Sequence, residues 1–249
     1  MGKAFELSYE NETEATPEQV WEAIATGPGL DAWFMGRNEV EPREGGTTTL
    51  EIAGFGDEAT VKVWEPPTRF VTESKEAPDG SKHVFDYRVE PRGTKTAVRW
   101  IHTGFLGSDN WELEYEGMGE GDPVYFAKLF EYLTYFRGRR ATPVNVFQPG
   151  PADKDEAWAR YLDAFGLDGD VAEGDRVTLR PAGLPEITGE VDVRTVTFLG
   201  VRSDDAMYRF MHVDWNRLVG LGHHLFDEGL GDDIEQRWAT WLAEVFPAG

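Results

Sequence analysis

The sequence contains no cysteine. Disulfide bonds, thiolate zinc sites and cysteine nucleophiles are therefore excluded together. No apolar run approaches the roughly 18 residues that a membrane-spanning helix needs. The N-terminal residues MGKAFELSYENETEA show no positive region followed by an apolar stretch, as a signal peptide would. We therefore expect a cytoplasmic protein without a membrane span.

Positive charge is also scarce. The chain has 24 Lys and Arg against 46 Asp and Glu, which gives a formal net charge of −22. Nucleic acids and anionic membrane surfaces are bound by Lys and Arg side chains that displace counterions from phosphate. The charge therefore argues against both classes of partner. Solubility explains such an acidic surface, and docking to a basic protein partner is the alternative that stays open.

Sequence patterns typical of catalytic and metal sites are missing. Neither HExxH nor GxSxG occurs. His223 and His224 are adjacent, and adjacent residues of a strand point to opposite faces, so we do not expect them to share a metal ion. The glycine-rich stretch 54–59 lies between two predicted strands, whereas a phosphate loop connects a strand to a helix. The stretch 117–121 is flanked by carboxylates, which would repel phosphate. We expect no cofactor and no metal.

What the sequence does contain is a regular alternation of apolar and polar residues. Residues 3–11 alternate as a half-buried strand does. Residues 38–105 continue the pattern in short segments separated by turn residues, of which Asp79-Gly80 is a strong hairpin signal. This spacing predicts an antiparallel meander.

Helices are predicted before and after the meander. Thr16 can cap a short helix with Pro17 in its first turn, and Gly27 belongs to the segment that ends it. Residues 107–122 are rich in glycine and acids and are predicted to form a loop. A broad apolar stripe at helical spacing then predicts a long helix that packs against the sheet, with Phe126, Leu129, Phe130, Leu133 and Phe136 on its buried face.

The remaining residues repeat this order in shortened form. Residues 143–153 carry three prolines and no periodicity, so we predict a linker there between domains 1–142 and 154–249. EGDRVTL matches EGGTTTL, and IEQRWATWLAEVF closes the second part as the long helix closes the first. We predict a tandem repeat whose second unit is smaller and lacks its own first strand.

A family resemblance rests on four segments: VWEAIATGPGLDAWF (20–34), EVEPREGG (39–46), VWEPPTRFV (63–71) and FDYRVEPRGTKTAVRWIHTGF (85–105). In this order they resemble the activator of heat-shock protein 90 ATPase homologue family of the START/SRPBCC superfamily, which includes birch-pollen-allergen-like and polyketide cyclase-like proteins. The resemblance covers residues 1–140. The sequence departs from the family pattern in two places: an acidic insert precedes the last helix, and a divergent second half follows it.

This resemblance implies an α+β helix-grip fold, in which an antiparallel sheet wraps around a long C-terminal helix and leaves a hydrophobic cavity. Relatives bind lipids or polyketides, catalyse cyclisation or dehydration, or stimulate a chaperone's ATPase. We predict that the cavity is lined by aromatic and apolar residues, although the same rings could simply fill the core. The candidates are Trp33, Phe34, Phe85, Tyr87, Val98, Trp100, His102, Trp111, Phe126, Phe130 and Leu133.

The sequence favours a non-catalytic binding protein for a hydrophobic, lipid- or polyketide-like small molecule. A chaperone-ATPase-activator-like interaction module, docking through its acidic surface, is one alternative. The other is a cyclase- or dehydratase-like enzyme, which needs a polar acid or base inside the cavity. Tyr87, His102 and Asp86 are the nearest candidates, although alternation places Asp86 on the outer face.

Overall fold

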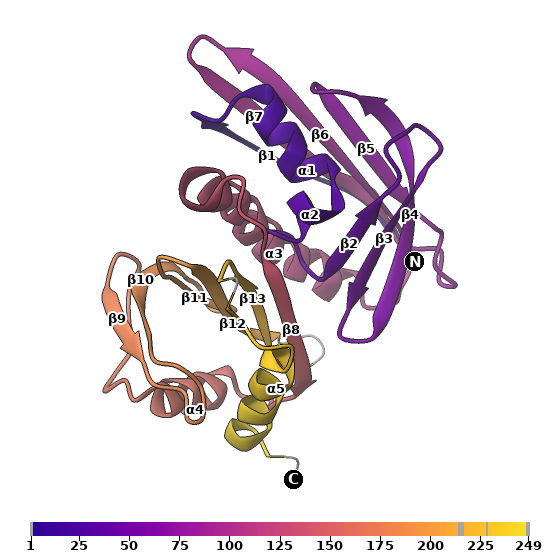
Figure 1. Cartoon of the computed structure of the whole chain (residues 1–249). Helices are drawn as coiled ribbons and strands as arrows, with labels where there is room; N and C mark the ends of the chain where they lie inside the picture. Colours follow the sequence, from indigo (N-terminus) through magenta and orange to yellow (C-terminus); the bar gives the residue numbers. More distant parts are fainter. Residues whose placement is uncertain (1, 214–216, 228, 248–249) are drawn as a thin grey trace. The chain divides into compact units, whose positions relative to one another are not determined.

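The computed structural model describes residues 2–213, 217–227 and 229–247. The chain divides into two compact units, the first ending at Arg140 and the second beginning at Ala141. Each unit has its own antiparallel sheet (Figure 1). Within the described ranges, every helix is too short or too polar to cross a membrane.

The first unit has a helix-grip fold. Its described residues form a seven-stranded sheet in the order β1-β7-β6-β5-β4-β3-β2, so the first strand pairs with the last. The strands are β1 (Lys3–Thr13), β2 (Arg37–Val40), β3 (Thr47–Ile52), β4 (Phe55–Glu65), β5 (Arg69–Ser74), β6 (Lys82–Arg92) and β7 (Lys95–Leu106). The helices are α1 (Pro17–Ala25), α2 (Gly27–Leu30) and α3 (Trp111–Glu131), which continues into the π-helical turn η1 (Tyr132–Phe136). The predicted antiparallel meander is confirmed.

Local sequence signals determine where helix α1 begins. The Thr16 side chain accepts a hydrogen bond from the Gln19 backbone N–H, and the Gln19 side chain accepts one from the Thr16 backbone N–H. This reciprocal capping box satisfies two backbone donors that the first helical turn leaves without partners. Val20 and Ile24 are then buried on the inner side of the helix.

Helix α3 includes residues 111–122, for which the sequence predicts a loop, so that prediction is wrong. Pro123 lies inside the helix, where it has no backbone N–H to donate to the preceding turn. Tertiary contacts hold the segment: the Asp122 carboxylate lies 2.7 Å from His102 Nδ1 on β7. The predicted stripe is buried at Phe126, Leu129, Leu133 and Phe136 and half-buried at Phe130.

The second unit also has one antiparallel sheet, with fewer strands than the first. Its described residues form a six-stranded sheet in the order β8-β13-β12-β11-β10-β9. The strands are β8 (Thr142–Pro149), β9 (Arg176–Leu179), β10 (Ile187–Arg194), β11 (Phe198–Arg202), β12 (Ala206–Val213) and β13 (Leu218–Leu225), and the helices are α4 (Lys154–Phe165) and α5 (Ile234–Val245).

Strand β8 occupies most of the segment 143–153, where the sequence predicts a linker. It pairs with β13 along its whole length, as β1 pairs with β7 in the first unit. The prediction that the second unit lacks its own first strand is therefore wrong. Pro143 and Pro149 are tolerated in β8 because it is an edge strand, which has a hydrogen-bonded neighbour on one side only. A proline, which lacks an N–H, is compatible with such a strand. The internal repeat itself stays a prediction.

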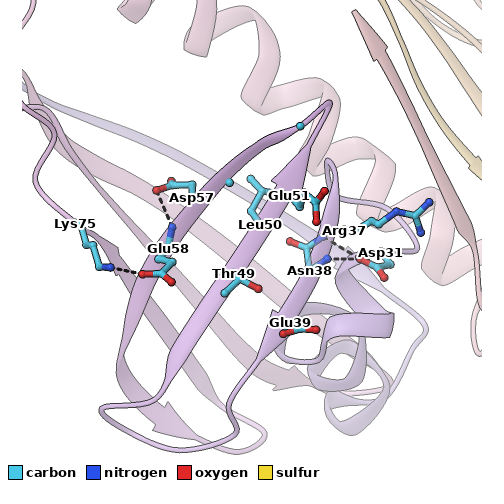
Figure 2. Close-up of a pocket in the computed structure, with 12 residues that line it drawn as sticks. Asp31, Arg37, Asn38, Glu39, Thr49, Leu50, Glu51, Asp57, Glu58 and Lys75 are labelled. Carbon is cyan, nitrogen blue, oxygen red and sulfur yellow. Dashed lines mark hydrogen bonds and ion pairs between the residues drawn. The ribbon is translucent and has the colours of Figure 1, made fainter. Parts of the chain in front are cut away.

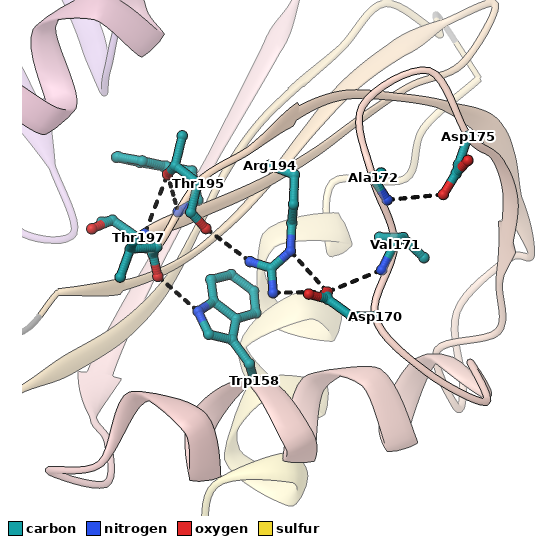
Figure 3. Close-up of polar contacts among 10 residues, drawn as sticks. Trp158, Asp170, Val171, Ala172, Asp175, Arg194, Thr195 and Thr197 are labelled. Carbon is teal, nitrogen blue, oxygen red and sulfur yellow. Dashed lines mark hydrogen bonds and ion pairs between the residues drawn. The ribbon is translucent and has the colours of Figure 1, made fainter.

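In the second unit, Arg194 ties the loop after α4 to the end of β10 (Figure 3). Its guanidinium lies 4.4 Å from the centre of the Trp158 ring. Arg194 Nε donates a hydrogen bond to Asp170 Oδ1 at 3.0 Å, and Nη2 forms an ion pair with the same oxygen at 2.9 Å. Arg194 also donates to the carbonyl of Thr195, and Trp158 Nε1 donates to the carbonyl of Val196. These contacts join α4, the loop and the β10–β11 turn.

Candidate functional site

The candidate site lies on the inner face of the first unit's sheet. Tyr87 on β6 is opposite Trp100 on β7, and Phe85 is opposite His102. The Trp100 ring packs 6.1 Å from that of Phe126 on α3, centre to centre. The alternating residues of β6 and β7 therefore face the helix, which confirms the side of the sheet predicted for them.

Aromatic rings fill much of the groove under the helices. Trp100 is fully buried, and its ring centre lies 5.5–6.5 Å from those of five neighbouring aromatic residues, Tyr9, Phe34, Phe85, Tyr87 and Phe126. Trp33 is also fully buried, and its Nε1 donates to the carbonyl of Ala23 on α1. Trp33 thus belongs to the packing between the helices and the sheet.

One apolar pocket, called here the inner pocket, remains open between α2 and strands β3 to β6. Its volume is about 80 Å³. Three of the predicted site residues line it, namely Phe34, Phe85 and Tyr87. The other lining residues are Leu30, Asn38, Thr48, Thr49, Leu50, Asp57, Glu58, Ala59, Phe70 and Thr72.

A second, open pocket of about 780 Å³, called here the outer pocket, adjoins the inner one (Figure 2). The two share five lining residues, Asn38, Thr49, Leu50, Asp57 and Glu58. The outer pocket is mainly polar and charged, and its other lining residues are Asp31, Arg37, Glu39, Glu51, Gly54, Gly56 and Lys75. Together the pockets form a polar entrance with an apolar end.

Two polar contacts organise the outer pocket (Figure 2). Asn38 donates from its backbone N–H and its side-chain amide to Asp31 Oδ1, at 2.7 and 3.1 Å. Burial raises the pKa of the Asp31 carboxyl above its ordinary value, while the bonds from Asn38 and the charge of Arg37 lower it. Across the pocket, Lys75 forms an ion pair with Glu58.

The structure also reveals a chain of three titratable groups beside the groove. His83 Nδ1 lies 3.0 Å from His102 Nε2, and His102 Nδ1 lies 2.7 Å from Asp122 Oδ2. His102 and Asp122 are buried, and His83 is half-buried. Burial lowers the pKa of His83, and the nearby His102 adds to this effect.

Sequence reasoning found only one member of this chain, His102. The signal for His83 was present, because it lies two residues before Phe85 on the same strand and therefore on the same face. Asp122 carried no such signal, because it lies in the segment predicted as a loop.

Several predicted site residues lie away from both pockets. Trp111 is half-buried at the start of α3, where Lys3 Nζ lies 4.6 Å from the centre of its ring. Val98, Trp100 and His102 are buried on the inner face of β7 and are not among the described residues that line either pocket. The described residues that line the inner and outer pockets also do not include the three candidates from α3 and η1, namely Phe126, Phe130 and Leu133.

The lowered pKa of His83 predicts how stability depends on pH. The unfolded chain takes up this proton around the ordinary value of 6.5, whereas the folded chain takes it up only at lower pH. Because the unfolded state binds more protons in that window, His83 makes the free energy of unfolding fall as the pH drops through 6.5, until the folded pKa is reached.

We therefore expect His83→Gln to reduce this loss of stability between neutral pH and about pH 5.5. Urea unfolding midpoints measured across that range for both proteins provide the check. Parallel curves for the two proteins would contradict the prediction.

Comparison with known proteins gives one family and several structural similarities. Residues 14–134 match the family described as activator of Hsp90 ATPase homolog 1-like protein. Protein MLL2253 from Mesorhizobium loti is similar, with 22% identity, 52% of this chain and 96% of that chain covered, and a TM-score of 0.46. The Aha1 dimer from Colwellia psychrerythraea has 18% identity, coverage of 54% and 99%, and a TM-score of 0.45.

A third similar structure extends over both units. The di-domain ARO/CYC BexL from the BE-7585A biosynthetic pathway has 12% identity, covers 96% of this chain and 94% of its own, and has a TM-score of 0.48. A search of the curated proteins found no match to this sequence.

Proposed function

The first unit belongs, over residues 14–134, to the activator of Hsp90 ATPase homolog 1-like family, and from this premise we propose that it binds a hydrophobic small molecule. The observation that carries the proposal is the apolar inner pocket opening into the polar outer pocket. Small-molecule sites are typically concave and mainly apolar, with a few polar groups that fix orientation. A lipid- or polyketide-like molecule, apolar at one end and polar at the other, matches this division.

The two volumes indicate how such a ligand would lie. The inner pocket of about 80 Å³ admits only the end of an apolar group. The rest of the molecule would occupy the outer pocket of about 780 Å³, where the side chains of Arg37 and Lys75 carry N–H donors. Phe34 and Phe85 would contact the apolar end.

Ala59→Phe is expected to block binding by filling the inner pocket from strand β4. Ala59 lines that pocket, whereas its neighbour Thr60 pairs with Glu73 on the outer face of the sheet. We expect Ala59→Phe to weaken binding of the neutral probe N-phenyl-1-naphthylamine by about tenfold or more, and Thr60→Phe to change it by less than about twofold. Fluorescence titration measures both affinities.

Native mass spectrometry of freshly purified protein provides an independent test. A co-purified ligand should appear as an added mass in the wild type and in Thr60→Phe but not in Ala59→Phe. Equal retention of the ligand by all three proteins would place it outside the inner pocket and contradict the proposal.

A second candidate, supported by the family description, is a chaperone-ATPase-activator-like interaction module. The net charge of −22 would serve a basic docking partner, and the cytoplasmic location predicted from the sequence would suit it. Pull-down with purified Hsp90 at low and high ionic strength tests this candidate, because salt screens attraction between exposed charges. Absence of any salt-sensitive complex would rule against it.

A further inference from the structure

The chain formed by His83, His102 and Asp122 extends from helix α3 across β7 to β6. Its two distances, 3.0 Å between the imidazoles and 2.7 Å from imidazole to carboxylate, are those of hydrogen bonds. Asp122 and His102 are buried, whereas His83 is half-buried. The chain therefore begins in the core and ends at a more accessible imidazole.

The chemistry of these groups determines where the protons lie. An ionised carboxylate can only accept, so His102 Nδ1 carries a hydrogen that it donates to Asp122. A neutral His102 then has a lone pair on Nε2, which accepts a hydrogen bond from His83 Nδ1–H. His83 Nε2 is left with a lone pair, and no described residue forms a hydrogen bond with it.

His83 is not itself among the described residues that line the inner pocket, but residues close to it are. Phe85, two residues further along β6, lines that pocket, and its ring lies 4.5 Å from that of His102, centre to centre. Across the sheet, the backbone N–H of His83 donates to Ser74 Oγ, and Ser74 pairs with Ala59, which also lines the pocket. A residue of the pocket wall thus lies two positions along β6 from an imidazole whose hydrogen-bonded chain ends at a carboxylate.

We propose that this chain accepts a proton from a ligand in the groove, and that the ligand is a hydrophobic molecule with a phenolic or enolic hydroxyl. Carboxylic acids are already ionised at neutral pH and aliphatic alcohols are far less acidic, so phenols, with an ordinary pKa of about 10, and enols are the hydroxyl groups best suited to give a proton to an imidazole. The inference rests on the proposed function, because it assigns the ligand class of the same groove.

The proton transfer needs no further reactant. The ligand's O–H bond breaks, its electron pair stays on the oxygen, and a new N–H bond forms at His83 Nε2. His83 releases its Nδ1 hydrogen to His102 Nε2, so the positive charge moves to His102. The adjacent Asp122 carboxylate stabilises that imidazolium, as the carboxylate of a catalytic triad does.

Charged groups from strand β4, helix α3 and the turn before β6 act on His83. Asp57 on β4, together with Glu114 and Asp122 on α3, favours its protonated form. Asp79, in the turn before β6, also favours the protonated form of His83 through its negative charge. Burial and the neighbouring His102 oppose protonation. The net effect lowers the pKa of His83, so its imidazole is kept neutral and able to accept a proton before the ligand binds.

The test compares the binding of 4-nitrophenol with that of 4-nitroanisole to the full-length protein. The two probes share a ring and a nitro group, but only 4-nitrophenol has an acidic hydroxyl, and its phenolate absorbs at longer wavelength. At about one pH unit below the probe's own pKa, we expect binding to produce the phenolate band. We also expect 4-nitrophenol to bind about tenfold more tightly than 4-nitroanisole.

Variants separate the proton acceptor from the pocket. His83→Gln should lose the phenolate band and the tenfold preference, and should keep its affinity for 4-nitroanisole within about twofold. Asp122→Asn keeps the shape but removes the charge behind His102, so it should lower the bound phenolate fraction with His83 intact. Lys82→Gln, on the outer face of the same strand, where Lys82 pairs with Glu73, should match the wild type.

Three results would be decisive against the inference. If both probes bind without a phenolate band, or if the band persists in His83→Gln, the proton-accepting chain is overturned and hydrophobic binding stands. If neither probe binds, the ligand groove itself is overturned, and the chain with it.

Discussion

Trp100→Ala is expected to lower the free energy of unfolding by roughly 3–5 kcal/mol and to abolish ligand binding. Trp100 is fully buried, and its ring meets those of Phe34, Phe85 and Phe126 from three different elements. Removing it leaves a cavity where the sheet, the segment after α2 and helix α3 converge. The pocket-lining rings Phe34 and Phe85 would then lose the surface that positions them.

Urea unfolding measures the stability, and titration with N-phenyl-1-naphthylamine measures the binding. Phe55→Ala is the control, because Phe55 is an aromatic residue of the same unit with 78% of its surface exposed. It should change stability by less than about 0.5 kcal/mol. A similar, small effect for both variants would contradict the role given to Trp100.

Trp100→Phe separates packing from hydrogen bonding at the same position. Trp100 Nε1 is buried and finds no hydrogen-bond partner among the described residues. Phenylalanine removes that donor while keeping an aromatic ring. We therefore expect a smaller loss of stability than for Trp100→Ala, because an unsatisfied buried donor costs about 1–3 kcal/mol in the native state.

Asp192→Ala is expected to destabilise the second unit by about 3–5 kcal/mol. Arg209 Nη1 donates to Asp192 Oδ2 at 2.9 Å, and the two side chains are only 4% and 2% exposed. Removing the carboxylate takes away this charge partner, while the guanidinium of Arg209 stays buried. Hydrogen exchange of the amides in β10 to β12 should report the loss locally.

Asp170→Ala provides the matched control in the same unit. Asp170 also pairs with an arginine, Arg194, but its side chain is 67% exposed, and Arg194 keeps its contacts with the Trp158 ring and the Thr195 carbonyl (Figure 3). Exposed pairs contribute about 0–1 kcal/mol. Equal effects of Asp192→Ala and Asp170→Ala would show that burial does not determine the strength of these pairs.

An apolar replacement of the buried pair sharpens this test. The double variant Asp192→Leu with Arg209→Met removes both charges together. Because replacing a whole buried pair by packed apolar side chains is often neutral or stabilising, we expect the double variant to be more stable than Asp192→Ala.

Residues close together in the sequence determined much of the first unit. The alternation at Phe85 and Tyr87 has a period of two, so the side of the sheet on which these residues lie follows from the chain itself. The cap at Thr16 depends on residues three positions apart, and the turn at Asp79-Gly80 depends on two neighbours. Such local signals agree along most of the first unit and predict its antiparallel meander, whereas the helix-grip fold was predicted from the family resemblance.

Only the tertiary structure decided the features that depend on distant partners. Residues 111–122 carry glycines that disfavour a helix, and their helical state is held by contacts such as that of Asp122 with His102. Strand β8 contains prolines typical of a linker, and it is a strand because β13, far along the chain, pairs with it. The His83–His102–Asp122 chain joins three separate elements, so no spacing within the sequence predicts it; packing the helix onto the sheet brings those three side chains together.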